Sequence, residues 1–146
     1  MRINALSAAI AGLTFAAIAF VAAPAIAESV SLKADLSAAG SAPPNDSKGT
    51  GAADVTFDAA TKMLTWKVTF SGLSGDATAA HFHGPADAGA NAGVVVPIKG
   101  TTSPMDGSAA LTDAQAAELL AGKWYVNVHT AAHKDGEIRG QVLKAK

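Results

Sequence analysis

Apolar and polar residues alternate along much of the chain, and this period of two is its main structural signal. The alternation is clearest at 30–36, 55–57 and 64–70, where apolar side chains occupy every second position. Successive side chains of a strand point to opposite faces, so these segments are predicted to be strands with one buried face. Residues 58–62 are predicted to join two of them as a hairpin loop.

The second half of the chain continues the pattern of short strands between turn residues. Strands are predicted there at 77–83, 94–98, 107–111, 124–129 and 137–143. Pro97 has no N–H to donate to a sheet ladder, so its strand is predicted to be an edge strand or to end there. The Ser-, Gly- and Pro-rich segment between Leu36 and Val55, and residues 86–93, are predicted to be loops.

One segment changes from the strand period to a helical one. Residues 112–115 fit a capping box, an apolar stripe follows, and Gly122 supplies a stop signal, so a short helix is predicted over about 113–121. About seven or eight strands with one short helix predict an all-β fold, an antiparallel Greek-key β-sandwich or barrel. A length of 146 residues fits a single domain after the N-terminal segment is set aside.

Residues 1–27 are predicted to be a signal peptide and not part of the fold. Arg2 precedes an apolar run over 5–23, and an A-x-A ending at Ala27 is followed by polar Glu28. Cleavage after Ala27 leaves 28–146 as the mature domain, periplasmic or secreted, with no further apolar stretch that could span a membrane. The alternative is a retained membrane anchor, because the run is about 20 residues long.

Composition excludes several functional classes. The chain is 49% hydrophobic and 16% charged, which is too apolar for a disordered tail. Its net charge is −1, so nucleic acid is not expected as a partner. It contains no Cys, which excludes disulfides, thiolate metal sites and cysteine nucleophiles.

The four histidines of the chain fall into two close pairs. His81 and His83 are two residues apart on a predicted strand, so both rings project from the same face. His129 ends another predicted strand, and His133 follows in a turn. If these strands are neighbours, the four imidazoles meet at one end of the sandwich and can hold one metal ion. The alternative is that the rings only pin loops by hydrogen bonds.

The absence of thiolates narrows the choice of metal. Imidazole suits Cu(II), zinc and nickel, and copper is favoured because it binds most tightly among the divalent ions of this series. Zinc is the alternative, with a carboxylate as a fourth ligand from Asp87, Asp106 or Asp135.

Arg139 lies near the loop that carries His133 and could steer an anion toward a metal. The alternative is that it forms a salt bridge or contacts carbonyl groups. Trp66, Trp124 and Tyr125 are predicted to be core anchors.

Four segments together resemble the CHRD (chordin-type) domain family. They are residues 80–86 (AHFHGPA), 93–95 (GVV), 124–130 (WYVNVHT) and 136–141 (GEIRGQ), and the resemblance extends over about 30–143. It implies an extracytoplasmic β-sandwich module. In animal chordin the domain accompanies Cys-rich modules that bind growth factors, and because this chain lacks such modules that role is not carried over.

The histidine pattern is also similar, more loosely, to the copper half of copper–zinc superoxide dismutases. By that similarity His81, His83 and either His129 or His133 would hold copper, and Arg139 would attract superoxide. The chain departs from that family because it lacks the Cys pair and an obvious zinc subsite.

Three hypotheses therefore remain open. The first is an exported CHRD domain that binds copper through a four-histidine cluster, for copper binding or buffering. The second is a copper-only enzyme similar to superoxide dismutase, and the third is a metal-free structural or adhesive module. Ring nitrogens more than about 5 Å from any common point would favour the third, since metal–nitrogen bonds are only about 2.0–2.1 Å long.

Overall fold

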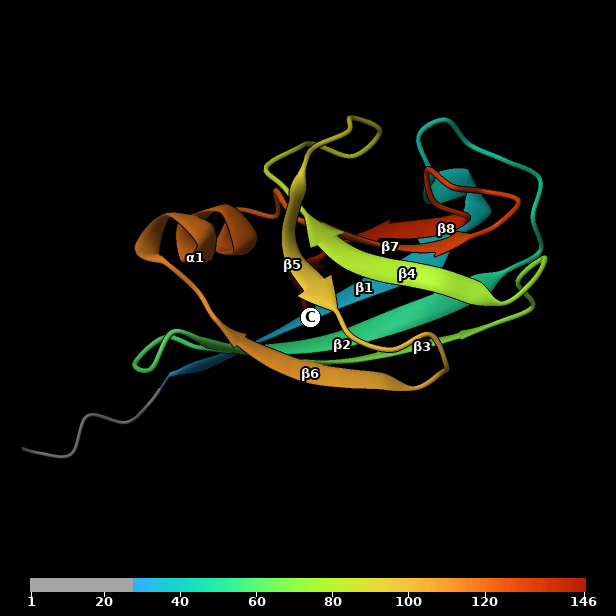
Figure 1. The fold of residues 1–146 in the computed structure, drawn as a ribbon. Coiled ribbons are helices and arrows are strands. Elements are labelled where there is room, and N and C mark those ends of the chain that lie inside the picture. Colours follow the sequence, from blue (N-terminus) through green and yellow to red (C-terminus); the bar gives the residue numbers. More distant parts are fainter. Residues whose placement is uncertain (1–27) are drawn as a thin grey trace, which may run out of the picture.

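The protein is described by a computed structural model over residues 28–146, so the predicted signal peptide at 1–27 lies outside the described residues. Nine strands of this part form one antiparallel sheet that curls into a nearly closed barrel, accompanied by one α-helix (Figure 1). The predicted all-β fold with one short helix is confirmed. Within the described residues no helix has the length and apolar character needed to cross a membrane.

The elements follow the order expected from the sequence. They are β1 Ser29–Ser37, the 3-10 helix η1 Ala38–Gly40, β2 Thr50–Asp58, β3 Met63–Ser71, β4 Ala77–His83, β5 Val94–Ile98, β6 Met105–Ala110, α1 Asp113–Leu120, β7 Tyr125–Thr130, β8 Ile138–Gln141 and β9 Leu143–Lys144. The capping box at the start of α1 is formed, since the Thr112 hydroxyl accepts from the Gln115 N–H and the Gln115 side chain accepts from the Thr112 N–H.

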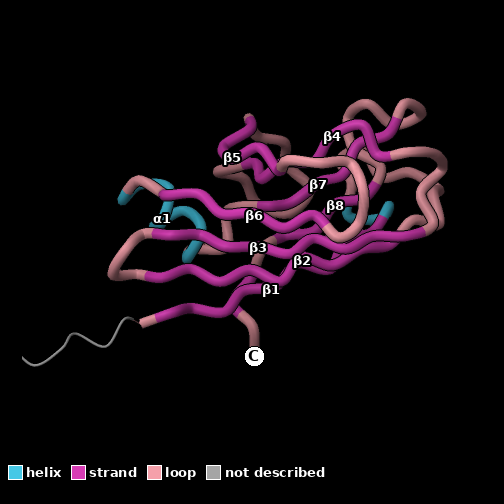
Figure 2. Tube along the Cα trace, turned by 60° about the horizontal axis from the view of Figure 1, so that its bottom comes forward, coloured by secondary structure: helices cyan, strands magenta, loops and turns pink. Residues whose placement is uncertain are grey.

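Neighbouring strands run in the order β5-β4-β7-β8-β1-β2-β3-β6, with β9 paired to β1. Figure 2 shows β6, β3, β2 and β1 side by side, with β4, β7 and β8 beyond them. The short strand β8 connects these two groups, because it pairs with β7 on one side and with β1 on the other. The path ends at β5 and β6, so the barrel has an open seam between these two edge strands.

The core lies inside the curled sheet, where the alternating apolar positions converge. Phe82 of β4 meets Trp66 of β3 edge to face with ring centroids 5.2 Å apart, and this contact links the two groups of strands. Fully buried side chains from both groups and from α1 surround it: Phe57, Leu64, Val68, Leu119, Trp124, Val126, Val128 and Ile138. This inner packing leaves the opposite face of β4, β7 and β8 for polar side chains.

Most boundaries lie within two residues of the prediction, and two segments differ by more than that. Strand β2 begins at Thr50, where the sequence indicated a loop up to Val55, because small residues with little pattern still pair in register with β1 and β3. The single strand predicted at 137–143 is divided into β8 and β9. Val142 interrupts it by donating its N–H to the carbonyl of Trp124 and turning its side chain into the core.

Candidate metal centre

The polar residues of β4 and β7 share the outer face of the sheet. On β7, Tyr125, Asn127 and His129 alternate with the core residues Val126 and Val128. In the antiparallel ladder between the strands, His81 lies opposite Asn127 and His83 lies opposite Tyr125. The pairing of these strands, which the sequence left conditional, therefore brings two distant histidine groups to one surface.

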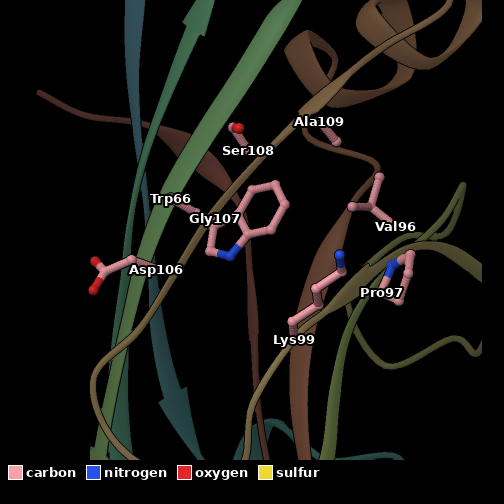
Figure 3. Close-up of a pocket in the computed structure, with 8 residues that line it drawn as sticks. All are labelled: Trp66, Val96, Pro97, Lys99, Asp106, Gly107, Ser108 and Ala109. Atoms are coloured by element: carbon pink, nitrogen blue, oxygen red, sulfur yellow. The ribbon is translucent and has the colours of Figure 1, made fainter.

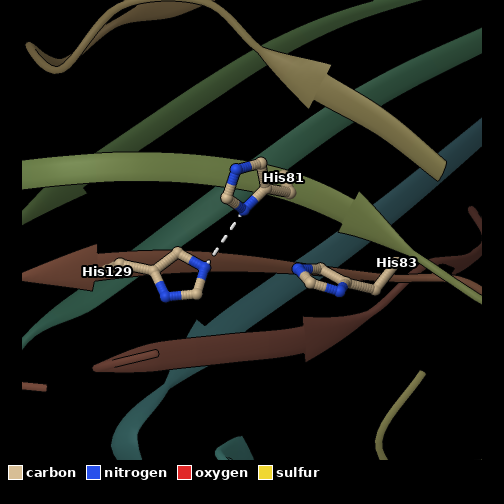
Figure 4. Close-up of side chains that lie close together, drawn as sticks. All are labelled: His81, His83 and His129. Atoms are coloured by element: carbon tan, nitrogen blue, oxygen red, sulfur yellow. Dashed lines mark hydrogen bonds between the residues drawn. The ribbon is translucent and has the colours of Figure 1, made fainter. Parts of the chain in front are cut away.

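Three of the four predicted histidines converge at this place. One ring nitrogen from each of His81, His83 and His129 lies within 4.8 Å of the other two, and Figure 4 shows the rings pointing toward one another. The closest pair is His81 Nδ1 and His129 Nε2, which are 3.1 Å apart. Among residues 28–146 this is the one group of three or more histidine or carboxylate side chains close enough to share an ion.

Backbone carbonyls fix the tautomers of two of these rings. His83 Nδ1 lies 2.9 Å from the carbonyl oxygen of Ala92, and His129 Nδ1 lies 2.7 Å from that of Lys134. A carbonyl oxygen only accepts, so each Nδ1 is the protonated nitrogen of its neutral ring. Each Nε2 then carries a lone pair that can bind a metal, and a hydrogen bond from Nδ1 to a carbonyl is typical of metal-binding histidines.

The environment keeps two of the rings in the form that binds a metal. Burial lowers the pKa of His83, which is 9% exposed. The His129 and Arg139 charges act in the same direction, whereas the hydrogen bond to Ala92 and the nearby Asn127 side chain oppose the shift without reversing it. Burial also lowers the pKa of His81, together with repulsion from His129 and His83. His83 Nε2 is buried and has no hydrogen-bond partner anywhere in the described part of the chain.

A stack of side chains supports His83 from one side. The Tyr125 ring lies parallel to the His83 ring, at 2° with centroids 4.9 Å apart. The guanidinium carbon of Arg139 lies 3.4 Å from the centroid of the Tyr125 ring. Tyr125 was predicted to be a core anchor, and it is buried on the outer face of the sheet instead. The alternation of Tyr125, Asn127 and His129 was the signal that could have shown this.

Arg139 is held beneath the loop between β4 and β5. It is 3% exposed, and its guanidinium donates to the side-chain oxygen of Asn91 and to the carbonyl of Ala90. Steering of an anion would require a guanidinium that reaches solvent. The structure instead gives Arg139 the role of fixing residues 90–91, next to the Ala92 carbonyl that orients His83.

The fourth predicted histidine and the predicted carboxylates lie outside the cluster. The backbone of His133 forms the turn after β7 through hydrogen bonds with Thr130 and Gly136, and its ring is not one of the three.

Asp87 forms an ion pair with Lys123. Neither Asp106 nor Asp135 joins the group of potential ligands. The structure thus offers three imidazoles and no carboxylate at this place.

A buried carboxylate lies beside the end of β7. Glu137 is 0% exposed, and it accepts hydrogen bonds from the Ser47, Ser74 and Thr130 hydroxyls and from the Ser74 N–H. Burial alone would raise the pKa of Glu137, but these four hydrogen bonds outweigh it and lower the pKa from 4.5 to about 2. Glu137 therefore joins the loops that carry Ser47 and Ser74 to the strand that carries His129.

A separate cavity of about 360 Å³ lies at the seam between β5 and β6. Figure 3 shows the Trp66 indole beside Gly107, with Lys99 and Pro97 across from it. A Cβ at residue 107 would lie 2.5 Å from the Trp66 ring, so the glycine makes room for the indole. None of the histidines lines this cavity.

Comparison with known proteins gives one finding. The family model of the CHRD domain matches residues 32–142, a stretch that contains the whole histidine cluster. Neither the curated proteins nor the solved structures contain a match to this chain.

Proposed function

The chain belongs to the CHRD domain family, and we propose that this member binds a divalent transition-metal ion through His81, His83 and His129. Copper is the ion that we expect to bind, and the proposed role is copper binding or buffering. The observation that carries the proposal is the convergence of three ring nitrogens within 4.8 Å on one sheet face.

The distances support a shared ion. Two nitrogens bound to one ion at about 2.0–2.1 Å are roughly 3–3.5 Å apart in square-planar or tetrahedral geometry. His81 Nδ1 and His129 Nε2 are already 3.1 Å apart. Because His129 is protonated on Nδ1, the His81 Nδ1–H donates a hydrogen bond to His129 Nε2, and a cation between the two nitrogens would take the place of that hydrogen. His83 Nε2 then needs only a small ring movement to reach the same ion.

The donor set supports copper over zinc. Three neutral imidazoles without thiolate or carboxylate favour the ion with the highest intrinsic affinity for nitrogen, which is Cu(II). A zinc site of the predicted kind would include a carboxylate as fourth ligand, and within residues 28–146 no aspartate or glutamate joins the cluster.

The two rival hypotheses receive less support. A dismutase-like enzyme needs an open metal position, which three ligands would leave, and also a cation that draws superoxide inward. The only cation predicted for that task, Arg139, is covered by residues 90–91. A metal-free module would not need three ring nitrogens within 4.8 Å of one another.

We also propose that the domain works outside the cytoplasm, in the periplasm or as a secreted protein. This proposal rests on the signal-peptide pattern at residues 1–27. An exported domain without cysteine has no thiolate with which to bind copper, and the cluster offers imidazole nitrogens instead.

Metal analysis of the purified protein tests the proposed site. After equilibration with Cu(II) or Zn(II) and removal of loosely bound ion, the wild type should retain about one copper per chain. Loss of a residue that only hydrogen-bonds to a metal ligand weakens metal binding by roughly 10–100-fold. His83→Ala and His129→Ala each remove a ligand, so each should weaken copper binding by more than that. His133→Ala is the matched control and should bind copper within about 2-fold of the wild type, because its ring lies outside the cluster.

Two results would contradict the proposal. Copper retention that is unchanged in both His83→Ala and His129→Ala would place the metal elsewhere. Loss of copper in His133→Ala to the same extent as in the other two variants would show that the three-histidine geometry is not the binding site.

A further inference from the structure

Asn127 occupies the centre of the face that carries the three histidines. It lies directly opposite His81 in the ladder between β4 and β7, and His129 follows two residues later on the same face. Side chains opposite each other in an antiparallel pair have Cβ atoms about 4.5–5.5 Å apart, and diagonal neighbours are still within reach. Asn127 is also 4% exposed, so its amide is enclosed with the rings.

The turn after β7 sets the direction of this amide. The Asn127 Nδ2 group donates to the carbonyl oxygen of Asp135 at 3.5 Å. Gly136 has φ +116°, and a Cβ there would lie 2.9 Å from Nδ2, so the glycine allows the close approach. If the amide were rotated by 180°, its Oδ1 would face the Asp135 carbonyl oxygen, and two acceptors repel each other. Because Nδ2 faces the turn, Oδ1 faces away from it.

Two buried acceptors on this face lack hydrogen-bond partners. Asn127 Oδ1 and His83 Nε2 are both enclosed, and neither is paired with any atom of residues 28–146. The tautomer fixed by Ala92 leaves His83 Nε2 without a proton, so both atoms only accept. Two acceptors cannot satisfy each other, and an unpaired buried acceptor costs about 1–3 kcal/mol. They need a cation, a hydrogen-bond donor, or both.

We propose that Asn127 is a positioning residue that selects the fourth ligand of the metal: its side-chain oxygen accepts a hydrogen bond from a water or hydroxide bound to the ion held by His81, His83 and His129. This inference rests on the proposed function. A metal satisfies His83 Nε2, and the hydrogen of the fourth ligand satisfies Asn127 Oδ1. The site therefore prefers an oxygen ligand that carries a hydrogen over an anion without one, such as azide.

Two variants at this position separate the hydrogen bond from simple packing. Asn127→Leu keeps the branched shape of the side chain but removes the acceptor, whereas Asn127→Asp keeps an oxygen there and adds a charge that can bind the metal directly. Gln141→Leu is the matched control. Its amide on β8 also has a buried unpaired oxygen, but the Nε2 group donates to Ala86 and Gly122, and the residue is not part of the cluster.

The metal-binding measurements use Cu(II) and Zn(II) alone. Asn127→Leu should weaken the binding of both ions by roughly 10–100-fold, which is the usual effect of losing a hydrogen bond to a metal ligand. The thermal midpoint of its metal-free form should change little, because the variant removes a buried unpaired acceptor and gives up only the 3.5 Å hydrogen bond to the Asp135 carbonyl. Gln141→Leu should bind both ions as the wild type does, whatever its stability.

Spectroscopy of the Cu(II) forms at saturating copper tests the fourth ligand itself. Pulsed electron paramagnetic resonance in D₂O should detect an equatorial water in the wild type and lose that signal in Asn127→Asp, where the carboxylate takes the position. Azide should displace the water at a concentration several-fold lower in Asn127→Leu than in the wild type, because the competing hydrogen bond is gone.

The outcomes distinguish this inference from the proposed function. If Asn127→Leu binds copper and azide as the wild type does while His83→Ala loses copper, the three-histidine site stands and the role of Asn127 is refuted. If the wild type does not bind either ion, the proposed function fails and the role of Asn127 fails with it.

Discussion

Single backbone atoms determine what the side chains of this face can do. The carbonyl oxygen of Ala92 accepts from His83 Nδ1 and from the Tyr125 hydroxyl, and the Ala92 N–H donates back to the same hydroxyl. One residue of the loop between β4 and β5 thus fixes both members of the stacked pair. The chemistry of His83 depends on this loop as much as on the strand that carries it.

Glu137 provides a prediction of pH dependence at the scale of one residue. Its pKa of about 2 in the folded chain lies below the ordinary 4.5, so its contribution to stability is fully present above about pH 4.5 and is lost as the pH falls toward 2. A difference of this size corresponds to about 3 kcal/mol in the free energy of unfolding. Urea unfolding at a series of pH values between 7 and 2 measures it.

Glu137→Gln is the matched variant for this measurement. The neutral amide cannot accept from all four donors, so the variant should be less stable than the wild type at pH 7 and should lose less stability on acidification. An equal loss in both proteins between pH 4.5 and 2 would show that other carboxyl groups cause the acid sensitivity.

At the scale of the element, the four-residue strand β8 joins the two groups of strands. It lies very close to β1, since a Cβ at Gly140 would be 2.2 Å from the Asp35 carbonyl oxygen and 2.7 Å from its carbon. These neighbours are backbone atoms of a paired strand, so they cannot move aside as a flexible side chain can. Glycine at this position lets β8 meet β1 and continue the sheet.

Gly140→Ala should therefore lower the free energy of unfolding by about 2 kcal/mol or more, because the added methyl group forces the two strands apart. Denaturant unfolding of the metal-free protein measures the effect. The control is Gly75→Ala, where a new Cβ meets nothing within 4 Å and stability should change by less than about 0.5 kcal/mol. Similar stabilities for both variants would mean that the contact between β8 and β1 is not tight.

At the scale of the whole molecule, the first described strand follows directly on the predicted cleavage site of the signal peptide. Strand β1 starts at Ser29, and the carbonyl of Glu28 accepts a hydrogen bond from the Ala59 N–H. Every strand, the helix and the histidine cluster described above lie within residues 28–146. Removal of residues 1–27 would leave each of these elements in the chain.

We predict that the exported protein begins at Glu28. Expression of the full chain in a bacterial host, followed by fractionation and mass measurement, should give a periplasmic or secreted product of residues 28–146. Ala27→Leu changes the last residue of the A-x-A motif and should leave residues 1–27 attached. A full-length protein that stays in the membrane fraction would favour the alternative of a retained anchor.

The sequence by itself determined the elements and the type of candidate chemistry. Alternation of apolar and polar residues is a local property, so it located most strands, and the capping box located α1. The spacing of His81 and His83 fixed that both rings leave the same face of one strand. The absence of cysteine excluded thiolate ligands from any metal site. Segments with small residues, such as the start of β2, carry no such pattern and were missed.

Only the tertiary structure decided which side chains meet. Strand pairing between β4 and β7 brought His129 to His81 and His83, whereas the turn at 131–136 kept the ring of His133 out of the group. The tautomer of His83, the covered position of Arg139 and the unpaired oxygen of Asn127 all depend on loops that close over the sheet. Contacts between residues distant in sequence arise from the packing of the whole chain, and no local pattern contains them.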